Sequence, residues 1–310
     1  MPTGRRDSIR LFNFAGINVF LHWSWFLVAV YEIQSRSGRY SSIGWNVVEY
    51  LALFLIVLLH EFGHALACRQ VGGRADRIVL WPLGGVAYVD PPPRPGATLW
   101  SIAAGPLVNV VLLPVLLLAI AAARSVGEAD ILRLVRSVAW INAGLLIFNI
   151  LPIYPLDGGQ ILRSLLWFVL GRARSLMAAA VLGLLGAIGF IGLALWRQDI
   201  WLGAIALYMV MNCWGGFKHA QALSRMAELR RRAGFACPTC NSGPPVGAYW
   251  RCAQCGQAFD PFETNAACPS CRTQYPTTQC LDCGRQHPIH EWASSSLAVP
   301  YSPRVGSFGA

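Results

Sequence analysis

The chain has 310 residues, of which 55% are hydrophobic and only 13% are charged, and its formal net charge is +10. This composition indicates a protein that crosses a lipid bilayer several times, and it excludes an ordinary soluble enzyme. The positive charge is not that of a nucleic-acid surface, because the arginines stand at the ends of apolar runs, where they orient membrane spans. We therefore expect contact with the lipid bilayer and no nucleic-acid partner.

Six apolar stretches are each close to the ~20 residues that a bilayer crossing requires. They cover about residues 18–33, 46–69, 97–123, 135–152, 175–196 and 200–216. Residues 11–20 are compatible with an interfacial strand or with the lead-in to the first span. Six spans place both termini on one side, and before residue 235 that side holds fifteen Arg and Lys residues against six on the other. The positive-inside rule thus predicts a multi-pass protein of the inner or plasma membrane with both termini in the cytoplasm.

The motif HEFGH, residues 60–64, stands inside the second apolar stretch. On a helix, His60 and His64 lie on one face about one turn apart, which is the spacing of two ligands of one zinc ion. Glu61 lies beside them and can act on a water at the metal. The alternative is a buried helix whose histidines match by chance. It is disfavoured because ionisable groups inside a membrane are costly and usually mark function.

A catalytic zinc needs a third protein ligand, and Asp157 is the candidate. It follows the fourth apolar stretch, on the same side and at a similar predicted depth as the histidines. Pro152 and Pro155 end the preceding helix, and Gly158 and Gly159 allow a tight backbone before the next helix. The alternative role is that of a helix N-cap, and for Asp157 alone the two roles are about even. Beside HEFGH, the ligand is favoured.

Residues 75–90 and the cysteine-rich tail carry two further patterns. The first has β-forming residues on both sides of PLGG, which predicts a hairpin. In the second, four CxxC knuckles use eight of the ten cysteines, which indicates two structural zinc sites of four thiolates each. Disulfides are disfavoured because the predicted topology places the tail in the reducing cytosol.

Pairing successive knuckles gives a first site of Cys237, Cys240, Cys252 and Cys255, and a second site of Cys268, Cys271, Cys280 and Cys283. Pairing of the two middle knuckles is the alternative. The predicted domains are then a membrane-embedded domain over 1–233, a double zinc ribbon over 234–292 and a disordered tail over 293–310. Zinc ribbons are usually interaction modules, so we expect a protein partner for them.

HEFGH within a span, followed by NxxPxxPLDGG at 149–159, resembles the site-2 protease family of intramembrane zinc metalloproteases. The resemblance covers about residues 10–215. It implies that three residues bind the catalytic zinc, namely His60, His64 and Asp157. It also implies that Glu61 is the catalytic base, and that Asn149 positions the substrate or stabilises the developing oxyanion.

Two other segments acquire an expected role from the resemblance. AGPLVN, residues 104–109, resembles the family's third-span motif, in which Gly105 and Pro106 permit close helix packing and Asn109 makes a polar contact. Ordinary packing of small residues between helices explains them equally well. The predicted hairpin corresponds to a membrane-associated β element, and we hypothesise that its edge pairs with an unwound substrate segment.

The sequence thus predicts an α-helical polytopic membrane protein with about six spans, a membrane-associated β-hairpin and a small cytosolic double zinc-ribbon domain. The expected activity is that of a metalloendopeptidase with one catalytic and two structural zinc ions. It would hydrolyse a peptide bond within or near a transmembrane segment of a membrane protein, such as an anti-sigma factor or a membrane-tethered regulator. The alternative is a catalytically inactive membrane scaffold whose zinc ribbons bind a protein partner.

Overall fold

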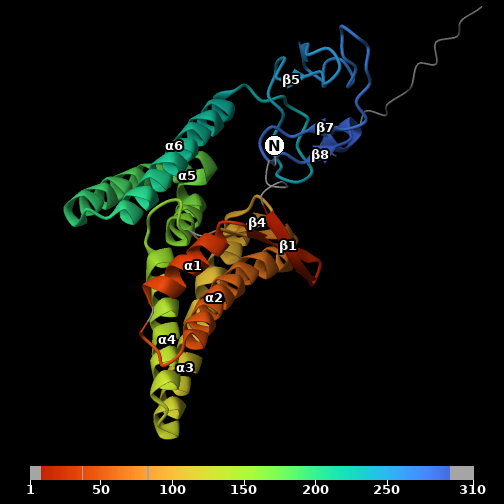
Figure 1. The fold of residues 1–310 in the computed structure, drawn as a ribbon. Coiled ribbons are helices and arrows are strands. Elements are labelled where there is room, and N and C mark those ends of the chain that lie inside the picture. Colours follow the sequence, from red (N-terminus) through yellow and green to blue (C-terminus); the bar gives the residue numbers. More distant parts are fainter. Residues whose placement is uncertain (1–7, 37, 82–83, 294–310) are drawn as a thin grey trace, which may run out of the picture. The chain divides into compact units, whose positions relative to one another are not determined.

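The computed structural model describes residues 8–36, 38–81 and 84–293. The chain forms two compact units, the first ending at Gln221 and the second beginning at Ala222. Figure 1 shows that the first unit combines long helices with a small sheet, whereas the second, after the last turns of a helix, consists mainly of short strands and loops. Most of the predicted disordered tail and part of the PLGG turn lie outside the described residues.

A four-stranded sheet joins two segments that are distant in the sequence. Its order is β1 (Ser8–Phe14), β2 (Ile17–His22), β3 (Arg74–Trp81) and β4 (Gly84–Asp90). The pairs β1–β2 and β3–β4 are antiparallel, and β2 and β3 run parallel. Strands β3 and β4 occupy the range of the predicted hairpin, and its place at the membrane stays a prediction. Because β4 is the last strand in the order, one of its edges is not covered by another strand of the sheet.

The continuous span expected over residues 18–33 differs from the structure. There, β2 takes residues 17–22, and the helix that follows, α1 (Trp25–Ser35), has only 11 residues. Such a helix is about 16 Å long, too short to cross a bilayer. Ile17 and Val19 are fully buried against β3 and against the helix that comes after α1, α2 (Ile43–Gln70). The difference arises because a short buried strand and the start of a span have the same apolar composition.

Four helices of the described residues are long and apolar enough to cross a membrane. They are α2 (Ile43–Gln70), α3 (Pro95–Val126), α4 (Ala129–Ile150) and α5 (Asp157–Arg197). Helix α5 is bent at Gly171, whose φ of 78° interrupts the helical backbone, and the predicted span 175–196 lies after this bend. The last predicted span falls within α6 (Ile200–Glu228). The chain is thus an integral membrane protein by the length and composition of these helices, and six spans remain a prediction.

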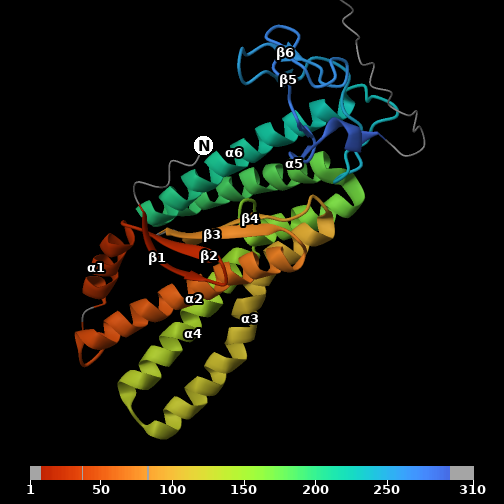
Figure 2. The same cartoon turned by 90° about the vertical axis from the view of Figure 1, so that its right-hand side faces the viewer.

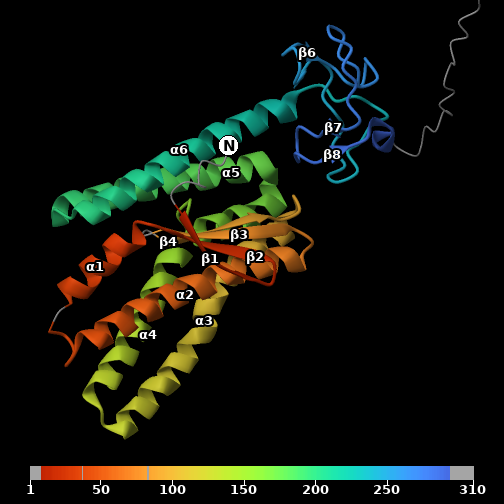
Figure 3. The same cartoon turned by 45° about the vertical axis from the view of Figure 1, so that its right-hand side comes forward.

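Helix α2 is the centre of the first unit, because it packs against α3, α4 and the strands β3 and β4. Figures 2 and 3 show α2 between the sheet and the α3–α4 pair. At Gly63 the approach of α3 is so close that a Cβ would lie 2.7 Å from the carbonyl oxygen of Ala104. The glycine therefore lets the two backbones touch, in the manner of small residues between membrane helices.

The second unit holds two short hairpins. Strand β5 (Trp250–Arg251) pairs with β6 (Ala258–Phe259), and β7 (Thr278–Gln279) pairs with β8 (Gln286–His287). A 3₁₀ turn, η1 (Ile289–Trp292), follows. Trp292 is buried against two cysteines and Phe262, whereas a second small cluster surrounds Phe259. Two clusters of this size are too small to stabilise a domain without a further cross-link.

Candidate active site

HEFGH lies in the second half of α2, where the side chains of His60, Glu61 and His64 are all buried. The structure brings Asp157 to the two histidines from the first residue of α5. The atom His60 Nε2 lies 3.0 Å from Asp157 Oδ2, and His64 Nε2 lies 3.3 Å from the same oxygen. The two histidine Nε2 atoms are 3.2 Å apart. Three metal-binding atoms from two distant segments therefore converge.

These distances can be tested against a tetrahedral zinc ion. Zinc–nitrogen and zinc–oxygen bonds near 2.05 Å place neighbouring ligand atoms about 3.3 Å apart. The three observed separations, 3.0, 3.2 and 3.3 Å, match such a triangle. The residues present therefore fit a zinc ion held by three protein ligands, with a fourth position left for water or substrate.

Asp157 is delivered by a turn that only small residues permit. A Cβ at Gly158 would lie 2.2 Å from the carbonyl oxygen of Ile150, and one at Gly159 would lie 2.3 Å from the amide nitrogen of Tyr154. The chain thus folds back on the end of α4 before α5 begins. The N-cap of α5 is Leu156, not Asp157. The Asp157 carboxylate is directed to the histidines, so the helix-cap alternative does not describe this residue.

The other ring nitrogen of each histidine, Nδ1, forms a hydrogen bond. His60 Nδ1 lies 2.6 Å from Asn109 Oδ1, and His64 Nδ1 lies 3.0 Å from the carbonyl oxygen of Ser101. Because both partners are acceptors, each Nδ1 carries the proton, which leaves the Nε2 lone pairs for a metal. Asn142 in turn holds Asn109 in place. Its Oδ1 accepts a hydrogen bond of 2.8 Å from the side-chain amide of Asn109, and its own side-chain amide donates a bond of 3.0 Å to the backbone carbonyl of Asn109. Asn109 and Asn142 are fully buried.

Sequence reasoning missed the role of Asn142. One signal was available, since Asn142 precedes Asn149 by seven residues and so shares its face of α4. The predicted polar contact of Asn109 has a partner in His60. Gly105 has a role beyond helix packing, because a Cβ there would lie 2.2 Å from His64 Nε2 and 2.9 Å from His60 Nε2.

Glu61 is held by strand β4. Its Oε2 accepts a hydrogen bond of 2.8 Å from the backbone N–H of Ala87. A Cβ at Gly85, on the same strand, would lie 2.3 Å from the Glu61 side chain. The N–H of Ala87 therefore points from the uncovered edge of β4 towards the site. Spacing along the sequence gave no sign of this contact, which joins residues 26 positions apart.

A cavity of about 400 Å³ opens beside these residues. Its wall includes both histidines, Glu61, Asp157 and the β4 residues Gly84 to Ala87. Asn149, the predicted substrate-positioning residue, is half-buried in the same wall. Further polar groups come from Gln160 of α5 and Asn212 of α6. The arrangement places candidate metal ligands, a carboxylate and amide donors around one cavity, as hydrolysis of a substrate requires.

The eight knuckle cysteines form two clusters, but not in the predicted grouping. The outer knuckles meet each other, and so do the inner ones: Cys237, Cys240, Cys280 and Cys283 in one cluster, and Cys252, Cys255, Cys268 and Cys271 in the other. The prediction that each knuckle pairs with the next one along the chain was therefore wrong. The structure has the alternative grouping, in which the two middle knuckles pair. The physical reason is the core: Trp292 and Phe262 pack against the two outer knuckles. Tyr275, which follows the inner knuckle that ends at Cys271, packs against Phe259 and donates a hydrogen bond to Cys252 of the other inner knuckle.

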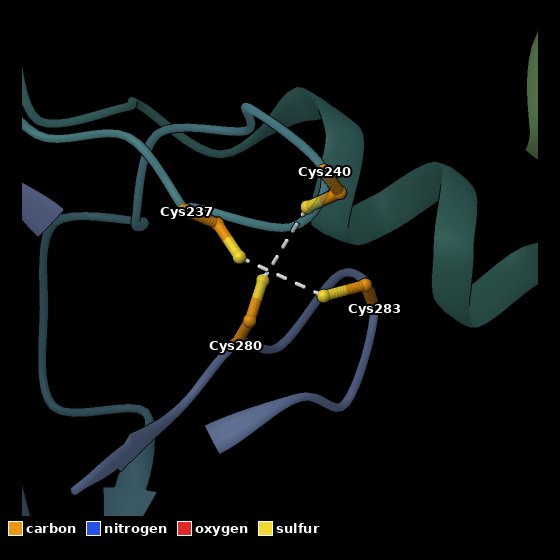
Figure 4. Close-up of side chains that lie close together, drawn as sticks. All are labelled: Cys237, Cys240, Cys280 and Cys283. Carbon is orange, nitrogen blue, oxygen red and sulfur yellow. Dashed lines mark hydrogen bonds between the residues drawn. The ribbon is translucent and has the colours of Figure 1, made fainter. Parts of the chain in front are cut away.

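The sulfur positions fit zinc in both clusters. In the outer cluster, drawn in Figure 4, the Sγ atoms of Cys237 and Cys283 are 3.7 Å apart, as are those of Cys240 and Cys280. In the inner cluster the corresponding separations are 3.5 and 3.6 Å. Zinc–sulfur bonds of 2.3 Å place the sulfurs of a tetrahedral site about 3.8 Å apart. Disulfide bonds require about 2.05 Å, so these sulfurs are not bonded to one another.

All four knuckles share one backbone design. In each, the N–H of the first cysteine donates to the carbonyl five residues later, and the N–H four residues later donates back to its carbonyl. The residue at that fourth position has positive φ in every case: Asn241, Gly256, Arg272 and Gly284. The turn presents both sulfurs of a knuckle to the same side. Hydrogen bonding lowers the pKa of Cys240 to about 4 through Cys280, and that of Cys252 to about 6 through the Tyr275 hydroxyl. The same hydrogen bonds raise the pKa of their partners, Cys280 and Tyr275.

Known proteins resemble this chain over the region that contains the candidate site. The sequence model of peptidase family M50 matches residues 48–129 and 117–193, which include HEFGH and Asp157. A zinc metalloprotease of Methanocaldococcus jannaschii is 34% identical over 224 residues, covering 72% of this chain and 62% of the relative. A putative zinc metalloprotease of Synechocystis is 27% identical over 238 residues, covering 71% and 62%. The chain thus spans 62% of the length of each of these curated relatives.

A shorter match is to stage IV sporulation protein FB of Bacillus subtilis, which is 35% identical over 116 residues, 36% of this chain and 38% of the relative. Among solved structures, the site-2 protease from Methanocaldococcus jannaschii superposes with a TM-score of 0.50 and 31% identity, covering 68% of this chain and 95% of that one. The sequence comparisons and the fold comparison agree. The chain belongs to peptidase family M50, the family of the site-2 proteases.

Proposed function

We propose that this chain is an intramembrane zinc metalloprotease that hydrolyses a peptide bond within or near a transmembrane segment of another membrane protein. The observation that carries the proposal is the convergence of His60, His64 and Asp157 beside the buried carboxylate of Glu61. Membership in a family of zinc metalloproteases supports it.

His60, His64 and Asp157 would hold the catalytic zinc. When bound, zinc polarises the scissile carbonyl and lowers the pKa of a bound water towards neutrality. Asn109 and the Ser101 carbonyl keep the two imidazoles in the tautomer that binds through Nε2. Without these acceptors each ring could rotate or bind through either nitrogen.

Glu61 acts as the general base. Its carboxylate takes the proton from the attacking water and then delivers it to the nitrogen of the leaving amine. The N–H of Ala87 holds one carboxylate oxygen, Oε2, and Oε1 lies beside Gly85, in the wall of the cavity. Asn149, in the wall of the cavity, supplies amide donors for the substrate or for the developing oxyanion.

A transmembrane helix must unwind before it can be cut, because its backbone carbonyls are engaged in helical hydrogen bonds. Strand β4 supports a route for the unwound segment. Its uncovered edge faces Glu61 through the Ala87 N–H, so a substrate strand added to this edge would lie next to the catalytic carboxylate. The substrate class we propose is a single-span membrane protein, such as an anti-sigma factor or another membrane-tethered regulator.

The second unit would hold two structural zinc ions, one in each cysteine cluster. In a small domain of this kind, metal binding supplies the folding free energy that the core lacks. We assign it the binding of a protein partner or the presentation of substrate. The distribution of arginine and lysine supports a multi-pass orientation with both termini in the cytoplasm, where thiolate sites are stable against oxidation.

Replacement of Glu61 by glutamine tests the protease assignment. The variant Glu61→Gln keeps the size of the side chain and leaves the proposed zinc ligands in place, so zinc content should equal that of the wild type. Comparison of membrane proteomes should then show single-span precursors that accumulate in cells carrying the variant. Glu128→Gln is the matched control, because Glu128 is exposed at the start of α4. A membrane proteome that is unchanged by Glu61→Gln would favour the scaffold alternative instead.

A further inference from the structure

The first segment of α5 ends in a cluster of cationic and aromatic side chains. Trp167 lies between two arginines along the helix, and both guanidinium groups lie over its ring. The guanidinium carbon of Arg163 is 6.0 Å from the ring centroid and that of Arg172 is 5.8 Å away. Arg172 directly follows the bend at Gly171. The bend thus brings the second arginine back to the tryptophan from the far side of the helix break.

No carboxylate in the described part of the chain forms an ion pair with Arg163. Its side chain is half-buried, and its Nε is buried without a hydrogen-bond partner there. A guanidinium group carries five N–H donors, and a buried donor without an acceptor costs free energy. Arg163 therefore holds a buried N–H donor that has no acceptor among the described residues.

A third basic group comes from α6. Partial burial, and then the positive charges of Arg172 and Arg163, lower the pKa of His219. The two arginines thus act electrostatically on α6 as well as on each other. Positive charge concentrated between helices of a membrane protein attracts the head groups of anionic lipids.

Apolar residues on the same segment are exposed. Leu165, Phe168 and Val169 have exposed fractions of 49%, 60% and 85%. In a membrane protein, side chains of this kind face acyl chains. An acidic protein segment would match the arginines but not these three residues. A molecule with an anionic head and a hydrocarbon tail matches both.

We propose that Arg163 and Arg172 bind the phosphate group of an anionic phospholipid, whose acyl chains lie against the exposed apolar residues of the same segment. Guanidinium groups bind phosphate with two parallel hydrogen bonds, which lysine cannot do. The segment that would carry the lipid also carries Asp157 and Gln160 into the cavity. The lipid would therefore brace the helix that supplies the third zinc ligand. The proposal does not depend on the protease activity.

Lipid binding to the purified full-length chain tests the proposal. The protein is kept in a neutral detergent, and native mass spectrometry measures the binding of phosphatidylglycerol against that of phosphatidylcholine. We expect selective binding of phosphatidylglycerol. Arg163→Gln should weaken it by at least about tenfold, the effect of losing charge-assisted hydrogen bonds. Arg174→Gln is the matched control, since Arg174 is exposed two residues after Arg172, and it should change binding by no more than about fivefold, the effect of one surface charge.

Arg163→Lys and Arg172→Gln keep the test decisive if Arg163→Gln does not fold. The lysine variant retains the charge but loses the paired hydrogen bonds, so its affinity should fall between those of the wild type and the glutamine variant. Three results would overturn the proposal. They are equal binding of the two lipids, equal effects of Arg163→Gln and Arg174→Gln, and displacement of the lipid by a soluble oligoglutamate peptide or by inorganic phosphate alone.

Discussion

Gly105 lies so close to His64 that a side chain at this position would overlap the imidazole: a Cβ would stand 2.2 Å from His64 Nε2. The two helices that carry these residues are held together at Gly63 and Ala104, so α3 has little freedom to withdraw. The nitrogen that would bind zinc therefore faces a backbone with no side chain.

Gly105→Ala should accordingly displace the histidines and remove the catalytic zinc. Alanine is favoured over glycine in a helix by about 1 kcal/mol, so helix propensity alone would stabilise the variant. Elemental analysis of the purified protein should show one zinc fewer than in the wild type. Gly144→Ala in α4 is the matched control, because no atom lies within 4 Å of its Cβ position. Unchanged zinc content in Gly105→Ala would mean that α3 yields.

Asn109→Ala removes the acceptor of His60 Nδ1 and leaves Asn142 Oδ1 without its donor. Loss of an outer partner of this kind typically weakens metal binding by about 10- to 100-fold. Titration with a zinc chelator should show that the catalytic ion leaves at correspondingly lower chelator concentration. Asn46→Ala serves as control, since Asn46 is a buried asparagine of α2 whose Oδ1 has no partner in the described residues.

Ala87→Pro deletes the N–H that donates to Glu61. Because this N–H points away from β3, the pairing within the sheet should survive, as edge strands tolerate proline. We expect full zinc content and a fall in the rate of cleavage by at least about tenfold, the effect of losing a hydrogen bond to a charged group. Ala87→Gly keeps the N–H and should retain most activity. Equal rates in the two variants would show that the bond does not orient the base.

The grouping of cysteines predicts which double substitutions remove one zinc and which remove two. Cys237→Ser with Cys283→Ser alters only the outer cluster and should cost one zinc ion. Cys237→Ser with Cys252→Ser alters both clusters and should cost two. Pairing of successive knuckles predicts the reverse. Elemental analysis of the full-length chain distinguishes the two schemes directly.

The parts of the site that the sequence could predict are those with local patterns. His60 and His64 are four residues apart, and Asp157 stands in a motif of prolines and glycines, so residue types and spacing pointed to all three. The structure brings them together, and their role as zinc ligands stays a prediction. The contacts of Asn142 with Asn109 and of Ala87 with Glu61 could not be foreseen, because they join residues 33 and 26 positions apart and depend on how helices and sheet pack.

The fold was predictable to the same degree. The long apolar helices could be predicted from the length and hydropathy of their sequences. Four helices of the described residues are long and apolar enough to cross a membrane. Strand β2 could not be predicted, because a six-residue apolar strand followed by a short apolar helix has the same composition as a membrane span. The cysteine grouping was ambiguous for a thermodynamic reason. Closing a longer loop costs little more entropy than closing a shorter one, so knuckle spacing does not select the partner. The aromatic core around Trp292 decides it.

The nesting of one cysteine cluster inside the other also sets an order of assembly during synthesis. All four inner cysteines have left the ribosome once residue 271 has emerged, whereas the outer cluster lacks half of its sulfurs until Cys280 and Cys283 follow. The inner cluster is thus complete at a stage when Cys237 and Cys240 still lack the other two cysteines of their cluster. The outer cluster of a newly made chain is therefore completed after the inner one.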